Sequence, residues 1–307
     1  MIERLLELLI WCLSRLPEAS AVAMSQRIAR VLIASKAEAA RIARINIALC
    51  FPNLPENDRQ HMCKDSLANS ILLAYEFARL RFADQASIQK KIVKVDGAEL
   101  LSEAWQQDQG VLLLTPHLGC WEVLGAYLGE SYPVSALYDR PNLAALEKII
   151  LDMRQRFGAT MHAISGAGLR NIIRAMRKGH LVVLLPDQVP DYQSGGAVAP
   201  FFEQDAFTML LAQRLLQKSK AKVLMASAVR SLDSNGIDYH MTFCEAEPGI
   251  LADDPEVHAT ALNASIEKLV GAHPEQYQWS YKRFKRLKKG EANIYPVSYT
   301  HLRAHET

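Results

Sequence analysis

The sequence lacks the marks of several large protein classes. Its 307 residues include five cysteines, an odd number, and no C-x-x-C pair. This usage argues against a disulfide framework or a zinc ribbon and is typical of a reducing compartment. The sequence holds no apolar run of about 18 residues or more, and no cationic stretch leading to an apolar run and an A-x-A site. It therefore predicts neither a self-evident transmembrane helix nor a cleaved signal peptide.

Several catalytic motifs are missing as well. The sequence contains no G-x-S-x-G, no H-E-x-x-H and no G-x-x-x-x-G-K-[ST]. Its glycine-rich sites, at 166–168 and 195–196, do not complete G-x-G-x-x-G. These absences disfavour α/β serine hydrolases, zincin metalloproteases, P-loop enzymes and Rossmann dehydrogenases. No grouping of metal-ligand residues stands out, so we expect neither a metal nor a cofactor.

The proportions of apolar and charged residues indicate a globular protein. Apolar residues make up 50% of the chain and charged residues 22%. The net charge of +2 identifies no partner, but cations gather near the C-terminus, at Lys282, Arg283, Lys285, Arg286, Lys288 and Lys289. Segment 280–290 contains no asparagine, and we expect no nucleic-acid binding. Its cations favour attraction to an anionic membrane surface, at about 1 kcal/mol each; a solvated helix end is the alternative.

A short amphipathic helix is predicted over residues 2–16. Its polar side chains fall into one sector of the helix surface, and leucines cover most of the rest. The residues in the polar sector are Glu3, Arg4, Glu7, Ser14 and Arg15. Such a helix is about 22 Å long, short of the ~30 Å hydrocarbon core of a bilayer. It can anchor the chain in a membrane interface, with Trp11 at the level of the headgroups. Packing on the protein's own core is the alternative.

The chain divides into three parts. Residues 1–90 form a helical N-terminal region, with one helix expected at 57–81. In residues 91–296, β-branched runs alternate with helical stretches such as 142–157 and 169–178. This predicts an α/β domain with a central mixed, mostly parallel β-sheet flanked by helices. The strand candidates are 92–95, 111–115, 134–138, 160–164, 181–185, 222–229 and 239–244, the last two joined by a hairpin signal at 233–236. Segment 186–200 is expected to be a functional loop, and 297–307 a non-native tail.

The strongest local feature is the run Val111-Leu-Leu-Leu-Thr-Pro-His117-Leu-Gly-Cys-Trp-Glu122. It places His117 at the carboxyl end of a buried strand, where open α/β sheets bind ligands. An imidazole there can act as a general base near neutral pH. A carboxylate on the first turn of the next helix, Glu122, can accept the other ring N–H and fix the tautomer. The alternative is a buried histidine paired with a helix-start acid.

The H-x4-[DE] spacing occurs three times, against about one expected by chance. His301/Glu306 lies in the suspect tail. His240/Glu245 lies in a strand candidate, where an odd offset puts the two side chains on opposite faces. Only His117/Glu122 has a strand–turn–helix context that can bring the two groups together.

The motif His117-Leu-Gly-Cys-Trp-Glu122 resembles the H-x4-[DE] block of the glycerolipid acyltransferase superfamily. Its H-x-G-x-W-E form resembles in particular the late acyltransferases of bacterial lipid A biosynthesis. Four further blocks agree in order, at 136–142, 153–158, 185–202 and 277–285, the last as Trp279-Ser-Tyr-Lys-Arg-Phe-Lys285. The resemblance spans roughly residues 10–296. Asp187 stands alone in the third block, where some members carry Asp-x-Asp-x-Gly.

The resemblance implies a membrane-associated acyltransferase on the cytoplasmic face of the bacterial inner membrane. The donor would be a fatty thioester on acyl carrier protein, and the acceptor a hydroxyl of an acyl chain on a lipid A precursor glycolipid. His117 would be the general base, supported by Glu122. The substrate-binding residues expected from the matching blocks are Arg140, Arg154, Arg156 and Asp187. No metal or other cofactor is implied.

Other interpretations stay open. Arg154 and Arg156 are two residues apart and cannot point the same way on a regular helix, so at least one is expected to face the site; a solvated pair is the alternative. Cys120 fits packing against the sheet better than a nucleophilic role. The same dyad would serve an acyltransferase for another glycolipid or a lysophospholipid, or a thioesterase. A non-catalytic lipid-binding protein is the alternative from a different class.

Overall fold

The computed structural model describes residues 2–191, 195–233, 236–285 and 294–295. Its first part is helical, as predicted. The helices are α1 Ile2–Ser14, α2 Glu18–Ala34, α3 Glu38–Cys50, α4 Glu56–Phe82 and α5 Gln85–Lys91. Pro17 and Pro55 stand directly before α2 and α4, where a proline preorganises the chain for the helix that follows. No helix among the described residues is both long and apolar enough to cross a bilayer.

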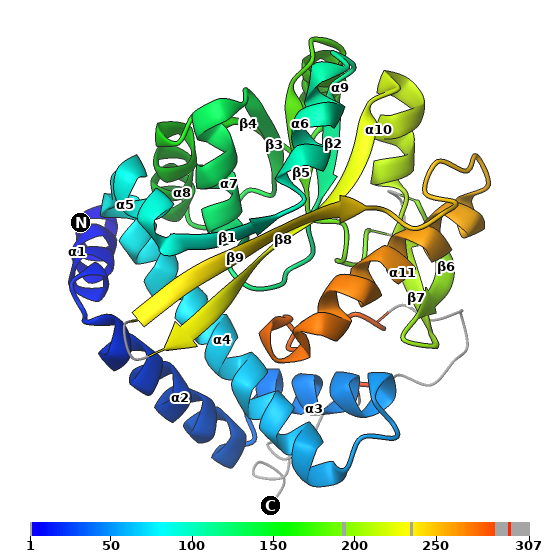
Figure 1. Cartoon of the computed structure of the whole chain (residues 1–307). Coiled ribbons are helices and arrows are strands. Elements are labelled where there is room, and N and C mark those ends of the chain that lie inside the picture. The colour runs from blue at the N-terminus through cyan, green and yellow to red at the C-terminus, as the bar shows by residue number, and fades with distance from the viewer. Residues whose placement is uncertain (1, 192–194, 234–235, 286–293, 296–307) are drawn as a thin grey trace, which may run out of the picture.

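A seven-stranded sheet forms the centre of the molecule, in the order β1-β9-β8-β2-β5-β3-β4 (Figure 1). Neighbouring strands run parallel except β8 and β9, which are antiparallel as the hairpin signal predicted. The strands are β1 Ile92–Asp96, β2 Val111–Leu114, β3 Val134–Tyr138, β4 Thr160–Ala163, β5 Leu181–Leu184, β8 Lys222–Asp233 and β9 Gly236–Glu245. The predicted fold class and all seven strand candidates are confirmed.

Helices cover both faces of this sheet. They are α6 Ala98–Gln106, α7 Trp121–Ser131, α8 Ala144–Arg156, α9 Gly166–Arg177, α10 Leu211–Ser219 and α11 Pro255–Ala272. Strand β2 shows the division, because its side chains alternate between two apolar cores. Leu112 and Leu114 belong to the core built with α9, α10 and α11, whereas Val111 and Leu113 belong to the core built with α6, α7 and α8.

One hairpin, made of two strands, was not predicted. The expected loop 186–200 ends early, because β6 Gly196–Phe201 pairs antiparallel with β7 Gln204–Met209 in a separate hairpin. This hairpin packs against α11. Glycine, alanine and proline make up four of the six residues of β6, so its sequence carries a weak strand propensity. The two strands form because backbone pairing and packing on α11 compensate for that weakness.

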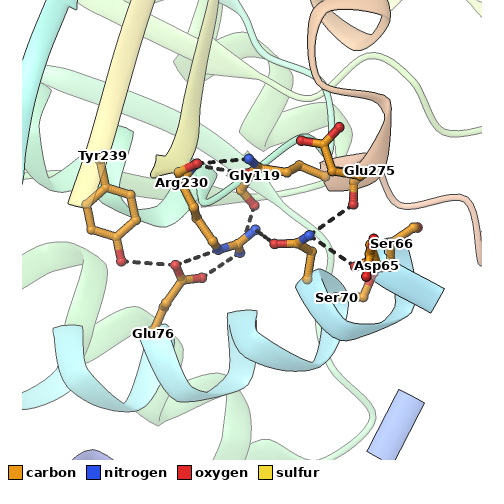
Figure 2. Close-up of polar contacts among 10 residues, drawn as sticks. Asp65, Ser66, Ser70, Glu76, Gly119, Arg230, Tyr239 and Glu275 are labelled. Atoms are coloured by element: carbon orange, nitrogen blue, oxygen red, sulfur yellow. Dashed lines mark hydrogen bonds and ion pairs between the residues drawn. The ribbon is translucent and has the colours of Figure 1, made fainter. Parts of the chain in front are cut away.

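A buried ion pair joins the N-terminal helical region to the sheet (Figure 2). Arg230 on β8 donates to both carboxylate oxygens of Glu76 on α4, at 2.6 and 2.5 Å. The phenol of Tyr239 donates to the same carboxylate at 3.0 Å. Arg230 also donates to the carbonyl of Gly119 at 3.1 Å. The helical region therefore holds the segment that follows β2, which contains His117.

Candidate active site

The structure places His117 where the sequence predicted, just beyond the carboxyl end of β2. The turn after it is held close to the sheet. Gly119 has a φ of +62°, and a Cβ there would lie 2.1 Å from the carbonyl oxygen of Ala228, so only glycine fits. Cys120 donates its backbone N–H to the same carbonyl at 2.7 Å. These contacts fix the backbone that carries the imidazole.

The partner of His117 is Asp187. The ring atom Nδ1 lies 2.7 Å from Oδ1 of Asp187, and the backbone N–H of His117 donates to Oδ2 at 2.9 Å. Burial alone would raise the pKa of Asp187, but the positive charge and hydrogen bonds of His117 outweigh it, and the pKa lies below its ordinary value. In the neutral form of the ring Nδ1 carries the proton, because an ionised carboxylate only accepts hydrogen bonds. The lone pair of Nε2 is then available to remove a proton.

Two more side chains surround the imidazole. The amide nitrogen of Gln188 lies 3.3 Å from Nε2. The indole of Trp121 packs edge-on against the ring, with centroids 4.8 Å apart. The imidazole is thereby held in position, and the side chain of His117 stays 14% exposed.

We expected Glu122 to contact His117, but its hydrogen-bond partner in the structure is Arg154. Glu122 lies on the first turn of α7, facing α8, and accepts two hydrogen bonds from Arg154, at 2.6 and 3.1 Å. Burial would lower the pKa of Arg154, but the Glu122 charge outweighs it and the pKa is raised. Among the described contacts of His117, Asp187 occupies the place that we predicted for Glu122.

The other two predicted arginines lie apart from this group. Arg156 donates to the carbonyl of Leu80, at the end of α4, and lies over the ring of Phe157. Arg140 follows β3, is 71% exposed and lies 3.6 Å from Glu147. The prediction that Arg154 and Arg156 point in different directions is confirmed, and Arg154 is the one beside Glu122.

An apolar cavity opens beside the Glu122–Arg154 pair, and no sequence motif predicted it. Side chains from α7, β3, α8, β4 and β5 form its wall, including Trp121, Ala126, Ala136, Met153 and Met161. Gly125 lies on the same wall, and a Cβ built there meets no atom within 4 Å. Among the lining residues that the structure describes, Glu122 and Arg154 are the charged ones. Such a cavity suits an aliphatic chain whose polar end stays near His117.

The structure also bears on two interpretations made from the sequence, those of Cys120 and of Arg283. Cys120 is fully buried, and burial raises its thiol pKa well above the ordinary value, so it packs rather than reacts. Arg283 corrects the expectation that the cations of segment 280–290 face an anionic membrane surface, and it is not solvated either. Its guanidinium is buried and donates to Thr208, Asn263 and the carbonyl of Phe207. The side chain is enclosed by these groups inside the protein, so it does not face a membrane.

Two neighbouring cations of that segment make contacts within the protein. Lys282 pairs with Glu38 at 2.6 Å, and Lys285 lies over the ring of Tyr281. Arg286, Lys288, Lys289 and the tail 297–307 lie outside the described residues. In the described part of the chain, no group of three or more side chains could hold a metal ion.

The first helix presents its apolar side outward. Its acidic residues point to the body of the protein, where Glu3 accepts from Lys148 at 2.7 Å and Glu7 from Arg81 at 3.1 Å. Leu13 packs on the core, but the larger apolar residues nearer the start are exposed, namely Ile2, Leu5, Leu8, Leu9 and Trp11. Core packing therefore accounts for only the end of α1.

Comparisons with known proteins agree on one family. The model of a family described as bacterial lipid A biosynthesis acyltransferase matches residues 3–286. The lipid A biosynthesis palmitoleoyltransferase of Escherichia coli (strain K12) is 30% identical over 256 residues, covering 83% of this chain and 81% of that protein. The lipid A biosynthesis lauroyltransferase of the same strain is 25% identical over 289 residues, covering 93% and 92%. The match includes the helical N-terminal region as well as the α/β part.

Proposed function

The chain belongs to the bacterial lipid A biosynthesis acyltransferase family, and from that premise we propose its reaction and its catalytic residues. The enzyme transfers a fatty acyl chain from acyl carrier protein to a hydroxyl of an acyl chain on a lipid A precursor. The observation that carries the proposal is the His117–Asp187 pair, 2.7 Å apart, beside an apolar cavity.

The imidazole is the general base. Nε2 of His117 takes the proton of the acceptor hydroxyl as that oxygen attacks the thioester carbonyl. Asp187 fixes the tautomer and stabilises the imidazolium that forms. Collapse of the tetrahedral intermediate breaks the C–S bond, and the departing thiolate takes the proton back from Nε2. The products are the ester and the free carrier thiol, so no covalent enzyme intermediate is needed.

Glu122 and Arg154 act together at the entrance to the cavity. Glu122 holds the guanidinium through two hydrogen bonds, so Arg154 presents a fixed positive charge next to the site. That charge stabilises the oxyanion or a phosphate of the glycolipid. Glu122 thereby supports catalysis through Arg154, whereas His117 is supported by Asp187. Arg140 and Arg156, which lie apart from this cluster, contribute less to substrate binding.

The test of the reaction is mass spectrometry of a lipid A precursor incubated with acyl carrier protein thioesters and the protein. The precursor is expected to gain the mass of one acyl chain. Free fatty acid without a lipid adduct would indicate a thioesterase, and acylation of a lysophospholipid alone would indicate the other acceptor class. Retention of the precursor without turnover would favour a lipid-binding protein.

The cavity holds the donor chain and limits its length. Replacing Gly125 with leucine is expected to shift the preferred donor to a chain about two to four carbons shorter, since the new side chain points into open space on the cavity wall. Competition among acyl carrier protein thioesters of different length measures the shift. Gly271→Leu is the matched control, because Gly271 is a helical glycine that also has open space around it but lies outside the cavity. An unchanged preference in Gly125→Leu would contradict this placement of the chain.

The exposed side of α1 binds the membrane on its cytoplasmic face. Leu5, Leu8 and Leu9 are each more than half exposed, on a helix whose acidic side chains are paired to the body. Insertion of such a face into the headgroup region removes apolar surface from water. This arrangement anchors the protein without a spanning helix.

Changing Leu5, Leu8 and Leu9 to serine is expected to weaken liposome binding by at least about 100-fold, because each leucine contributes on the order of 1.5 kcal/mol or more when buried. Co-sedimentation with liposomes of bacterial lipids measures the change. The control replaces three exposed apolar residues of other elements, Val93, Leu251 and Val257, with serine. Equal losses in both variants would show that α1 is not the anchor.

A further inference from the structure

We propose that the outer faces of α9 and α10 form the docking surface for the acidic carrier protein that delivers the acyl chain. The inference rests on the proposed function, since it names where the donor binds. The surface, called here the α9–α10 cationic surface, consists of seven exposed side chains: Arg170, Arg174, Arg177, Lys178, Arg214, Lys218 and Lys220.

The spacing of these cations puts them side by side. On α9, positions 170, 174 and 177 fall on one face at helical period, opposite the buried Ile172 and Met176, and Lys178 caps the end of the helix. On α10, Arg214 and Lys218 are four residues apart. The two helices touch, since Arg177 donates twice to the carbonyl of Lys218, at 3.1 and 2.7 Å. The cations therefore form one continuous surface.

These cations carry charge that the protein itself does not neutralise. Among the residues that the structure describes, none of the seven forms an ion pair, although Lys91, Lys148 and Lys268 on other elements do. The recorded side-chain bonds of Arg174 and Arg177 go to neutral groups, an amide oxygen and a carbonyl. Such a surface attracts a negatively charged partner.

The position of the surface fits a partner that must reach His117. Helix α9 begins just after β4, and α10 ends just before β8, so the first turns of both helices, including Arg214, lie at the carboxyl edge of the sheet. Arg177 and Lys218 lie at the other ends of the helices, so the surface extends from the side of His117 toward the opposite edge of the sheet. The guanidinium of Arg214 approaches Gly195, on the loop that carries Asp187 and Gln188. A carrier seated here can send its thioester arm along that edge.

The surface is also remote from the exposed side of α1. Helices α9 and α10 cover the face of the sheet opposite to α8, which contacts α1, and Figure 1 shows α1 and α10 on opposite sides of the molecule. A soluble acidic protein can therefore dock while α1 lies in a bilayer. An anionic membrane is less suited to this surface, and the experiment distinguishes the two.

The test compares donors of different size with the full-length protein in detergent at low salt. The double variant Arg174→Glu/Arg214→Glu is expected to lose about 10- to 1000-fold in kcat/KM with acyl-carrier protein, and the loss shrinks as salt rises. With a small acyl-pantetheine thioester, which lacks the carrier, kcat/KM is expected to stay within about twofold of wild type. The control Lys36→Glu/Lys90→Glu changes the charge equally on exposed cations of other elements.

A direct titration separates this inference from the proposed function. The carrier protein is expected to bind wild type and to bind the double variant at least about tenfold more weakly, whether or not turnover occurs. Binding without turnover with any donor would refute the proposed reaction and leave the docking surface supported. Equal kcat/KM losses with both donors, equal losses in the control, or weaker liposome binding with unchanged carrier binding would overturn the docking surface.

Discussion

Replacing His117 with alanine is expected to lower the rate of acyl transfer by about 100- to 10,000-fold, the usual contribution of a positioned acid–base group. The variant should still fold, because the imidazole lies at the edge of the sheet and the backbone around it is held by Gly119 and Cys120. Mass spectrometry of the acylated precursor over time measures the rate. Circular dichroism shows whether the fold is kept.

Asp187→Asn is expected to reduce kcat strongly while leaving KM near its wild-type value. An asparagine can donate to Nδ1, which would favour the tautomer that has its proton on Nε2 and cannot act as a base. Asp191→Asn is the matched control, since Asp191 is an exposed carboxylate of the same loop. Glu122→Gln should act differently, by loosening Arg154 and changing KM as well. If Asp187→Asn kept full kcat, Asp187 would not be the residue that orients His117.

The second large effect concerns stability. Arg230→Met is expected to destabilise the protein by about 3–5 kcal/mol, because the Glu76 carboxylate would stay buried without its partner. For a chain of this size the unfolding temperature should fall by on the order of 10 °C. The carbonyl of Gly119 would lose its donor at the same time, so activity should decline before unfolding. Differential scanning calorimetry and an activity assay over temperature measure both effects.

A double variant tests whether the unpaired Glu76 carboxylate causes the loss of stability. Glu76→Leu combined with Arg230→Met removes both charges and should recover much of the lost stability. Lys268→Met serves as the surface control, because its pair with Glu247 is largely exposed and should contribute about 0–1 kcal/mol. If Arg230→Met behaved like Lys268→Met, the ion pair would not be holding α4 to the sheet.

The sequence predicted His117 better than it predicted the partner of His117. The apolar run at 111–114 identifies a buried strand, and the histidine follows from its position after that strand. The partner depends on which strands are neighbours. Strands β2 and β5 pair in parallel with Leu114 opposite Leu184, so His117 and Asp187 each lie three residues beyond that pair. The spacing along the chain favoured Glu122 as the partner of His117, whereas the pairing of β2 with β5 brings Asp187 to the imidazole.

The burial of Arg283 and the apolar cavity were not predicted either, because both depend on contacts between distant segments. Arg283 looks like one of several surface cations in the sequence, but the fold surrounds it with Phe201, Thr208 and Asn263 from distant segments. The cavity needed five elements to assemble, so no local pattern could reveal it. Periodicity predicts elements well and predicts long-range neighbours poorly.

Helix α8 connects the exposed helix α1, the proposed membrane anchor, with the cavity proposed to hold the acyl chain. Its Lys148 holds Glu3 of α1, while Met153 and Arg154, further along the same helix, wall the cavity. A helix is roughly 10 Å across, so α1 seated in a bilayer would bring the cavity wall within about that distance of the hydrocarbon. An amphiphilic acceptor could then move sideways out of the lipid leaflet and reach His117 with its chains never fully hydrated.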